Sequence, residues 1–254
     1  MLNPNIRFSE LVRKGLRFRR RFEEAKCSVV PCDFTWYPYD SFSNLFYVQR
    51  LLRDTNLSLK VLSGGDPVLD IGAADGALSF FLESLGYGVH AYDHSGTNIN
   101  RMLGIRALAS ALDSKIKIED TDIDGSFNLQ GQYGIALFLG TLYHLKNPFY
   151  VLEKLSAHVR YCFLSTRIVR FGPDKTVRLD SIAVAYLVDP EECNSDITNY
   201  WIFSQPGILR LAKRTGWQVC SMTSSGASES DPITEQGDER IFLLLRSTRS
   251  SLEP

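Results

Sequence analysis

The sequence predicts an α/β fold, a doubly wound and mostly parallel sheet of seven strands with an N-terminal helical cap. The first observation is a short apolar run at 68–71, which leads through a turn with two glycines into an apolar helix that ends at Gly86. The second is that apolar, β-prone runs recur at 89–92, 133–140 and 161–166, separated by stretches with helical periodicity. The third is an ordinary globular composition over 254 residues, with 44% hydrophobic and 22% charged residues.

Basic residues are concentrated at the start of the chain. Eight of them fall within residues 1–26 against three acidic residues, although the whole chain carries a net charge of −1. We expect a helix over residues 5–26 with a broken apolar stripe that comprises Ile6, Leu11, Leu16 and Phe22. Its charged face is either a solvated surface or an arm that binds phosphate. A solvated surface is favoured, because runs of charge usually face water.

Aromatic residues crowd the stretch 33–42. Because aromatic rings are costly to leave in water, they either pack a cap onto the core or line a pocket for a substrate. Residues 43–60 are predicted to be helical, and residues 1–60 are expected to form an N-terminal helical and aromatic cap. The side chains that we assign to the substrate are Trp36, Tyr37 and Tyr39. The apolar face of the predicted helix comprises Leu45, Val48, Leu51 and Leu52.

The turn after the first strand reads Asp70-x-Gly72-x-Ala74-x-Gly76. Without a Cβ, Gly72 and Gly76 let the backbone turn tightly and approach a ligand. A second strand ends at Asp93, 23 residues after Asp70, where a carboxylate can accept both hydrogen bonds of a ribose diol. An ordinary βα turn followed by a surface aspartate is the alternative. The two acids and the turn together favour a site for a nucleotide-like ligand.

This Rossmann-like turn lacks the three glycines of the dinucleotide fingerprint. It resembles instead the first motif of the class I S-adenosylmethionine (SAM)-dependent methyltransferases. The resemblance implies that the turn holds the amino-acid end of SAM and that methyl transfer needs no metal. It also implies a set of cofactor-binding residues, which are Asp70, Gly72, Ala74, Gly76 and Asp93.

A short third strand at 116–118, preceded by a helix expected over 94–112, leads into a cluster of aspartates at 120–124. In the resembled family an acid and an apolar residue at this point flank the adenine, and the resemblance therefore assigns Asp122 and Ile123 to the cofactor. A solvated acidic turn is an equally good interpretation of the same residues.

The fourth strand, 133–140, is too apolar to be half exposed. Open α/β sheets bind ligands beyond the carboxyl ends of their strands, so Leu139 and Gly140 are expected to contact the cofactor near its sulfonium. Tyr143 is expected to line the same site. His144 is either a general base for a hydroxyl substrate or a structural histidine that bonds to the backbone, and the structural role is favoured.

Residues 167–200, after the fifth strand, are predicted to be irregular. An insertion of this length is usually functional, so we expect a lid or a substrate pocket. Arg167 and Arg170 within it either hold an anionic acceptor or are solvated loop charges.

The last part of the chain completes the predicted sheet. Ser204 caps a helix that Gly216 ends, and strands are expected at 217–220 and 240–245, on either side of a polar loop at 223–238. The expected divisions after the cap are a SAM-binding domain at 61–246, which includes the insertion, and a frayed tail at 247–254.

A second resemblance is specific to residues 140–148. Gly140-Thr141-Leu142-Tyr143-His144 followed by Asn147-Pro148 resembles the G-x-L-Y-H-x-x-x-P stretch of the tRNA wobble-uridine carboxymethyltransferases, and weaker similarity extends over residues 60–246. It implies that Tyr143 and Arg240 bind a carboxylate and that Tyr200 belongs to a segment that contacts the substrate. The family's third carboxylate-reading residue, an N-terminal lysine, has no clear counterpart before Trp36. Plain SAM is therefore expected in preference to carboxy-SAM.

We therefore expect an enzyme that moves a methyl group from SAM to a hydroxyl or amine of a small-molecule acceptor. The alternatives are a tRNA wobble-uridine (carboxy)methyltransferase and a non-catalytic SAM-binding protein. Five scattered cysteines without C-x-x-C spacing favour a reduced, cytoplasmic protein without structural zinc. No apolar run is long enough to span a membrane, and nothing in the sequence indicates an oligomeric state.

Overall fold

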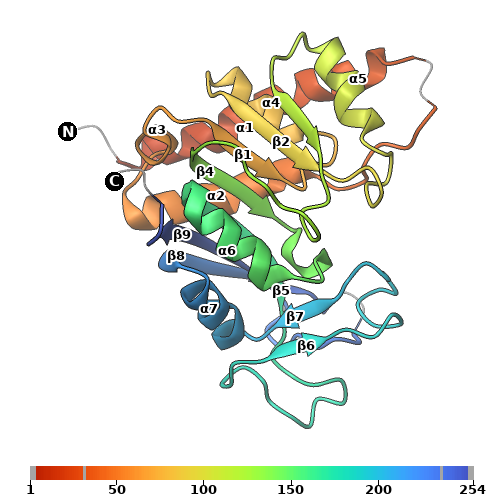
Figure 1. The fold of residues 1–254 in the computed structure, drawn as a ribbon, viewed down its shortest axis with the longest axis vertical. Helices are drawn as coiled ribbons and strands as arrows, with labels where there is room; N and C mark the ends of the chain where they lie inside the picture. Colours follow the sequence, from red (N-terminus) through yellow and green to blue (C-terminus); the bar gives the residue numbers. More distant parts are fainter. Residues whose placement is uncertain (1–3, 31–32, 235–236, 251–254) are drawn as a thin grey trace.

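The computed structural model describes residues 4–30, 33–234 and 237–250, in which a nine-stranded sheet lies between two layers of helices (Figure 1). Five strands are parallel, in the spatial order β3-β2-β1-β4-β5. Their bounds are Lys117–Asp120 for β3, Val89–Asp93 for β2, Val68–Ile71 for β1, Tyr133–Leu139 for β4 and Val159–Ile168 for β5. The predicted α/β, Rossmann-like fold is confirmed, and the carboxyl ends of these strands meet at one edge of the sheet.

Two antiparallel strands continue the sheet beyond β5. β9 (Glu239–Ser247) pairs with β5, and β8 (Trp217–Gly226) pairs with β9. The polar loop therefore begins after Gly226 and not at residue 223, because the Ser- and Thr-rich end of β8 is a half-exposed edge strand that tolerates polar side chains. The predicted tail also starts later, since β9 runs to Ser247. Residues 251–254 of that tail lie outside the described residues.

The remaining two strands lie in and just after the predicted insertion. β7 (Trp201–Phe203) runs parallel to the end of β5, and β6 (Ala185–Leu187) lies antiparallel to β7. β9 pairs with one edge of β5 along its length, as far as Glu239. On the other edge β4 ends at Leu139, before β5 does, so β7 pairs with the end of β5 on that edge. The sheet has nine strands where seven were predicted, and the additional pair protrudes past the carboxyl end of β4 (Figure 1).

Helices α1 to α5 cover one face of the sheet. Phe22, Leu45 and Phe80 belong to one buried cluster with Ile135 and Leu244 of the sheet. Residues that are far apart in sequence thus share one core on this face. The bounds are Pro4–Ser28 for α1, Asn44–Thr55 for α2, Leu59–Ser63 for α3, Ala77–Ser84 for α4 and Leu103–Ala111 for α5, with a 3-10 turn, η1, at Ser41–Ser43.

Helices α6 (Pro148–His158) and α7 (Gln205–Arg214) cover the opposite face, and a 3-10 turn, η2 (Leu142–His144), follows β4. Neighbouring residues of a strand point to opposite faces, so Val68 belongs to the first cluster and Leu69 to the second. Because both faces are covered, β4 is an almost continuous apolar run, as predicted. No helix within the described residues is long and apolar enough to cross a bilayer.

The helix predicted over 94–112 begins only at Leu103. Arg101 and Met102 have φ angles of 54° and 62°, which no α-helix accommodates. The side-chain oxygen of Asn98 accepts hydrogen bonds from the backbone N–H groups of Asn100 and Met102 and so stabilises a turn in place of a helix.

The helix predicted over 43–60 is divided in two. Asn56 adopts the left-handed conformation, with a φ of 55°, and ends α2. The Ser58 hydroxyl then accepts a hydrogen bond from the Val61 N–H and caps α3. The predicted apolar face of α2 is confirmed, since all four of its residues are buried: Leu45, Val48, Leu51 and Leu52.

Helix α1 packs into the core along a stripe that differs from the predicted one. Phe22 is 2% exposed, whereas Leu16, which was assigned to the same stripe, is 54% exposed. A Cβ on Gly15 would lie 2.2 Å from a methyl carbon of Leu45, so Gly15 is the point of close approach between α1 and α2, and its neighbour Leu16 faces solvent. The side chain of Ile6 lies outside the described residues.

This packing makes α1 part of the folded domain and not an appendage. We expect Phe22→Ala to lower the free energy of unfolding by about 3–5 kcal/mol, because it opens a cavity between α1 and α4. Leu16→Ala on the same helix is the matched control, and its effect should be within about 0.5 kcal/mol. Urea unfolding of both variants measures the difference, and equal effects would contradict this description of α1.

Candidate functional site

The turn between β1 and α4 is held in a conformation that needs small residues. Gly72, Ala74 and Gly76 have positive φ angles of 71°, 54° and 79°. A Cβ on Gly72 would lie 2.2 Å from the Thr141 hydroxyl oxygen, so the turn after β1 and the segment after β4 are in close contact at this point. Three of the five residues that the sequence assigned to this part of the site thus form one tight turn.

The Asp93 carboxylate at the end of β2 fixes this turn. One of its oxygens accepts a hydrogen bond from the Ala74 N–H at 2.7 Å, and the other accepts from the His94 N–H at 2.8 Å. Burial raises the pKa of Asp93, and these two backbone hydrogen bonds oppose the rise together with the nearby Asn98 side chain. Each oxygen of an ionised carboxylate has a further lone pair, so Asp93 can still accept two hydrogen bonds from a diol.

Asp70, in contrast, is bound to helix α4. It is 5% exposed, and its carboxylate accepts a hydrogen bond from the Ser79 hydroxyl at 2.6 Å. Burial raises the pKa of Asp70 to about 6, although the Ser79 hydrogen bond favours the ionised form. Asp70 therefore ties the end of β1 to the helix that follows the turn.

The aspartates at the end of β3 and just after it have separate backbone partners. Asp120 accepts from the Ser95 N–H at 2.9 Å, next to the loop that follows Asp93. Asp122 is exposed and accepts from the Asp124 N–H at 3.0 Å, whereas Ile123 is buried against the α6 face. Asp122 is thus tied into its own loop, and the assignment of Asp122 and Ile123 to the adenine stays a prediction.

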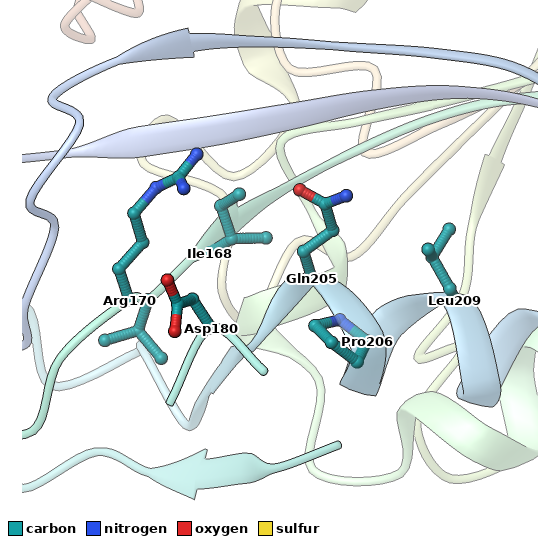
Figure 2. A pocket seen from close by; sticks show the side chains of 7 residues that line it. Ile168, Arg170, Asp180, Gln205, Pro206 and Leu209 are labelled. Carbon is teal, nitrogen blue, oxygen red and sulfur yellow. The ribbon is translucent and has the colours of Figure 1, made fainter. Parts of the chain in front are cut away.

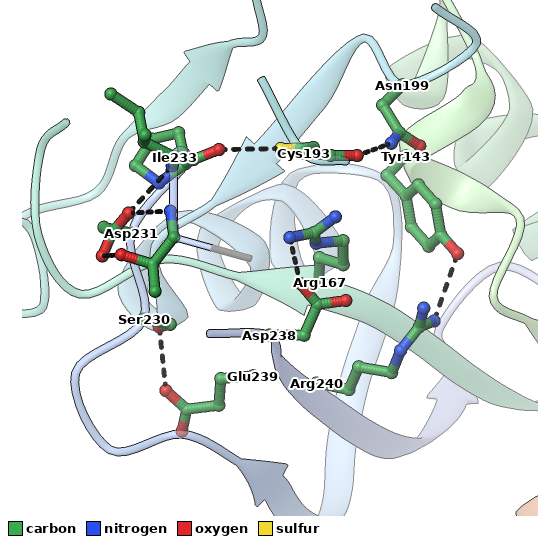
Figure 3. A network of polar contacts seen from close by, with 12 residues as sticks. Tyr143, Arg167, Cys193, Asn199, Ser230, Asp231, Ile233, Asp238, Glu239 and Arg240 are labelled. Atoms are coloured by element: carbon green, nitrogen blue, oxygen red, sulfur yellow. Dashed lines mark hydrogen bonds and ion pairs between the residues drawn. The ribbon is translucent and has the colours of Figure 1, made fainter. Parts of the chain in front are cut away.

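Tyr143 and Arg240 meet at the carboxyl end of β4 (Figure 3). Arg240 Nη1 donates a hydrogen bond to the Tyr143 hydroxyl at 3.2 Å, and the guanidinium carbon lies 5.4 Å from the ring centroid. Half-buried Leu139 ends β4, and Gly140 has a φ of 77°. A Cβ on Gly140 would lie 3.6 Å from Arg240 Nη1 and 3.8 Å from the Tyr143 hydroxyl, so Gly140 lies directly beside this pair.

The acidic residues near Arg240 are already bound to other arginines. Arg167 is 5% exposed and forms an ion pair with Asp238 (Figure 3). Arg170 binds Glu239 through two hydrogen bonds of 2.6 Å. Neither Arg167 nor Arg170 is a solvated loop charge. Among the described residues, no carboxylate lies within ion-pair distance of the half-buried Arg240.

His144 binds the inserted segment. Its Nδ1 lies 3.1 Å from the Thr198 carbonyl oxygen and 2.9 Å from the Thr198 hydroxyl. Burial lowers the pKa of His144, so the imidazole is neutral near pH 7. Because a carbonyl oxygen only accepts, Nδ1 carries the proton and Nε2 has the free lone pair. The Tyr200 N–H donates to the Tyr143 carbonyl at 2.8 Å, which fixes the predicted substrate residue Tyr200 beside the same turn.

The aromatic segment of the N-terminal cap crosses the glycine turn. The Tyr37 N–H donates to the Asp75 carboxylate at 2.8 Å, and the Tyr37 hydroxyl accepts from the Ile99 N–H at 3.1 Å. Asn100 donates to the other Asp75 oxygen at 2.7 Å and to the Thr35 carbonyl at 3.2 Å. Burial raises the pKa of Tyr37 to about 12, so its hydroxyl stays protonated. The segment is thereby fixed to both the first turn and the loop after β2.

A cavity of about 550 Å³ lies between this segment, α1 and the turn. It is lined by Trp36, Tyr37 and Tyr39, whose assignment to the substrate stays a prediction, and also by Lys26 and Asp75, which the sequence analysis missed. Asp75 could have been predicted as a site residue, because it lies inside the glycine turn. Nothing in the sequence placed Lys26, because only the folded chain brings α1 next to the turn.

Figure 2 shows a smaller cavity of about 210 Å³ at the start of α7. Its charged groups are already paired, since Arg170 binds Glu239 and Asp180 binds Arg178. It contains none of the residues predicted to bind the cofactor. Within the described part of the chain, no cluster of His, Cys, Asp and Glu side chains is suited to bind a metal.

The sequence of residues 42–222 matches the model of a family described as a methyltransferase domain. A search of curated proteins gives no match. A similar solved structure is the N-terminal domain of EvdMO1 with SAH bound, at 14% identity over 90% of this chain and 96% of that chain, with a TM-score of 0.53. Another is a putative methyltransferase from Bacillus halodurans C-125, at 13% identity over 80% and 98%, with a TM-score of 0.57. These structures are similar to the chain in fold.

The buried Asp70 yields a pH-dependent prediction. A carboxyl whose pKa is higher in the folded than in the unfolded chain lowers stability as pH rises between the two values, and the full penalty is present above the folded pKa of about 6. Asp70→Asn should therefore raise the free energy of unfolding by about 1–3 kcal/mol at a pH of about 7.5, and by much less at a pH of about 4.5. Urea unfolding at both pH values measures this, and a gain independent of pH would contradict it.

Proposed function

The chain belongs to the methyltransferase-domain family that its sequence matches over residues 42–222, and we propose that it transfers the methyl group of SAM to a hydroxyl or amine of a small acceptor that carries a negative charge. The enzyme is a SAM-dependent methyltransferase. The single observation that supports a negatively charged acceptor is the position of the Arg240 guanidinium. It lies half-buried beside Tyr143 and forms no direct ion pair with a carboxylate among the described residues.

The residues at the glycine turn fit SAM. The two free lone pairs of Asp93 match the ribose diol, and the lack of a Cβ at Gly72 and Gly76 leaves the backbone accessible. Leu139 ends β4 and Gly140 follows it, and we assign both residues to the sulfonium side of SAM. When bound, SAM supplies a methyl group that the positive sulfur makes electrophilic. The protein's own task is to align the acceptor behind that methyl group and to exclude water.

Arg240 is suited to orient an anionic acceptor. Leaving a guanidinium out of bulk water without a counter-charge costs free energy, and an anionic group on the acceptor would offset this cost through charge-assisted hydrogen bonds. The charge of Asp238 helps to raise the pKa of Arg240, but Asp238 and Glu239 form their direct ion pairs with Arg167 and Arg170. The Tyr143 hydroxyl accepts from Arg240, so its own proton is free to donate to the acceptor.

A hydroxyl or amine nucleophile loses a proton when it is methylated. The neutral His144, next to Tyr143 with ring centroids 4.2 Å apart, is our candidate for the group that accepts it. The Thr198 carbonyl fixes its Nδ1 proton and leaves Nε2 as the basic atom. The same hydrogen bond also gives His144 a positioning role, because it anchors the inserted segment beside Tyr143.

A tRNA wobble-uridine (carboxy)methyltransferase is the second candidate. The supporting observation is that Tyr143 and Arg240, 97 residues apart in sequence, form the pair that the sequence resemblance assigns to a carboxylate. In that case Arg240 would bind the carboxylate of carboxy-SAM and not a group on the acceptor. The two candidates thus differ in which molecule supplies the counter-charge of Arg240.

We expect Asp93→Ala to weaken the binding of S-adenosylhomocysteine (SAH) by about 1.5–3 kcal/mol, because the diol loses a charged acceptor. Isothermal titration calorimetry measures the affinity. The exposed Asp113→Ala is the matched control and should leave the affinity unchanged. Asp93 also binds Ala74, so a thermal melt must show that the variant is folded. Unchanged affinity in a folded Asp93→Ala variant would contradict the assignment.

The acceptor class is tested by transfer of an isotope-labelled methyl group from SAM. The protein is incubated in parallel with the small-molecule fraction and with the tRNA fraction of its source cells, and mass spectrometry locates the label. We expect label on an anionic small molecule, at least about tenfold less of it with Arg240→Gln, and an unchanged amount with the exposed control Arg210→Gln. Label on tRNA alone would replace this proposal with the second candidate.

A further inference from the structure

Helix α1 closes the cavity of about 550 Å³ beside the glycine turn, although it lies outside residues 42–222, which match the family model. Ala74 lines this cavity and also donates its N–H to the Asp93 carboxylate. A ligand whose ribose is bound by Asp93 therefore reaches the cavity directly across the turn. Two groups extend from the ribose of SAM, and only the amino-acid end is zwitterionic, with an ammonium and a carboxylate. It is therefore the end that suits a cavity lined by charged side chains.

Lys26 is the basic residue of α1 in this cavity whose N–H donors are not all used by described residues. Its side chain is 15% exposed, and its ammonium lies 4.9 Å from the ring centroid of Phe22 and 5.3 Å from that of Trp36. The other basic residue that lines the cavity, Arg19, is paired with Asp40 at 3.0 Å. The aromatic contacts restrict the lysine side chain and keep its charge at the cavity wall.

The ion pair between Lys26 and Asp75 is long. The distance from the ammonium to the carboxylate is 3.5 Å, whereas Tyr37 and Asn100 donate to the same carboxylate at 2.8 and 2.7 Å. An ammonium has three N–H donors, and Asp75 takes at most one of those of Lys26. A largely buried ammonium whose one ion pair among the described residues is long, and whose other contacts are with aromatic rings, is therefore well placed to bind a second carboxylate.

We propose that Lys26 binds the α-carboxylate at the amino-acid end of SAM. The inference rests on the proposed function, since it takes SAM as the ligand. The start of α4 would also attract the carboxylate, because the first N–H groups of a helix favour negative charge. Ala77 lines the same cavity, and the N-cap residue Gly76 has no side chain that could bind these N–H groups. The N-terminal cap is then part of the cofactor site as well as of the core.

The test compares SAH with S-adenosyl-3-thiopropylamine, which lacks only the α-carboxylate. Calorimetry on the wild-type protein should give about 10- to 100-fold tighter binding for SAH, because a charge-assisted hydrogen bond is present only there. In Lys26→Met this preference should fall to less than about threefold, with SAH weakened and the decarboxylated analogue unchanged. Lys26→Arg, which keeps the charge, should retain most of the preference.

Lys14→Met is the matched control, since Lys14 lies on the solvent side of the same helix, 49% exposed. It should change neither affinity. Equal affinity of the wild-type protein for the two ligands, or a parallel loss of both in Lys26→Met, would overturn the proposal and leave Lys26 with a packing role. Failure of the wild-type protein to bind either ligand would instead contradict the proposed function. The wild-type comparison stands even if Lys26→Met does not fold.

Discussion

The hydrogen bond between the Ala74 N–H and the Asp93 carboxylate is the interaction on which the site depends. It joins the carboxyl ends of β1 and β2 across a turn in which three residues have positive φ. The turn is also pressed against the segment after β4, since Gly72 has no room for a Cβ beside Thr141. The strand ends that would hold the ribose and the sulfonium of SAM are therefore fixed relative to each other before the cofactor binds, which lowers the ordering cost of binding.

The opposite side of the site depends on how charges are paired. Three arginines lie where the carboxyl end of β5 meets the start of β9. Arg167 and Arg170 bind Asp238 and Glu239, and Arg240 is left with a tyrosine hydroxyl. Net charge alone does not indicate such a site, because the chain as a whole is nearly neutral. The lack of a direct ion pair at Arg240 arises from the pairing of β5 with β9, which sets Arg167 opposite Arg240 and leaves the two arginines with different partners.

Local patterns predicted the fold and the residues that we assign to the cofactor, and long-range contacts explain what was missed. The glycine turn and Asp93 are visible because the chemistry is contained in short segments next to strands. β6 and β7 have three residues each, too few to show an alternating pattern. β7 can pair with β5 only because β5 extends beyond the end of β4. Lys26 was missed for a similar reason, since the close approach of α1 to α2 at Gly15, and of α1 to the turn, is set by packing between distant segments.

The proposed cofactor site is tested most directly by a crystal structure of the protein with SAH bound. We expect both ribose hydroxyls to bind the Asp93 carboxylate and the sulfur to be directed toward Gly140, with Tyr143 and Arg240 facing the position of the methyl group. Ribose hydroxyls bound elsewhere, or a sulfur directed away from Tyr143 and Arg240, would contradict it.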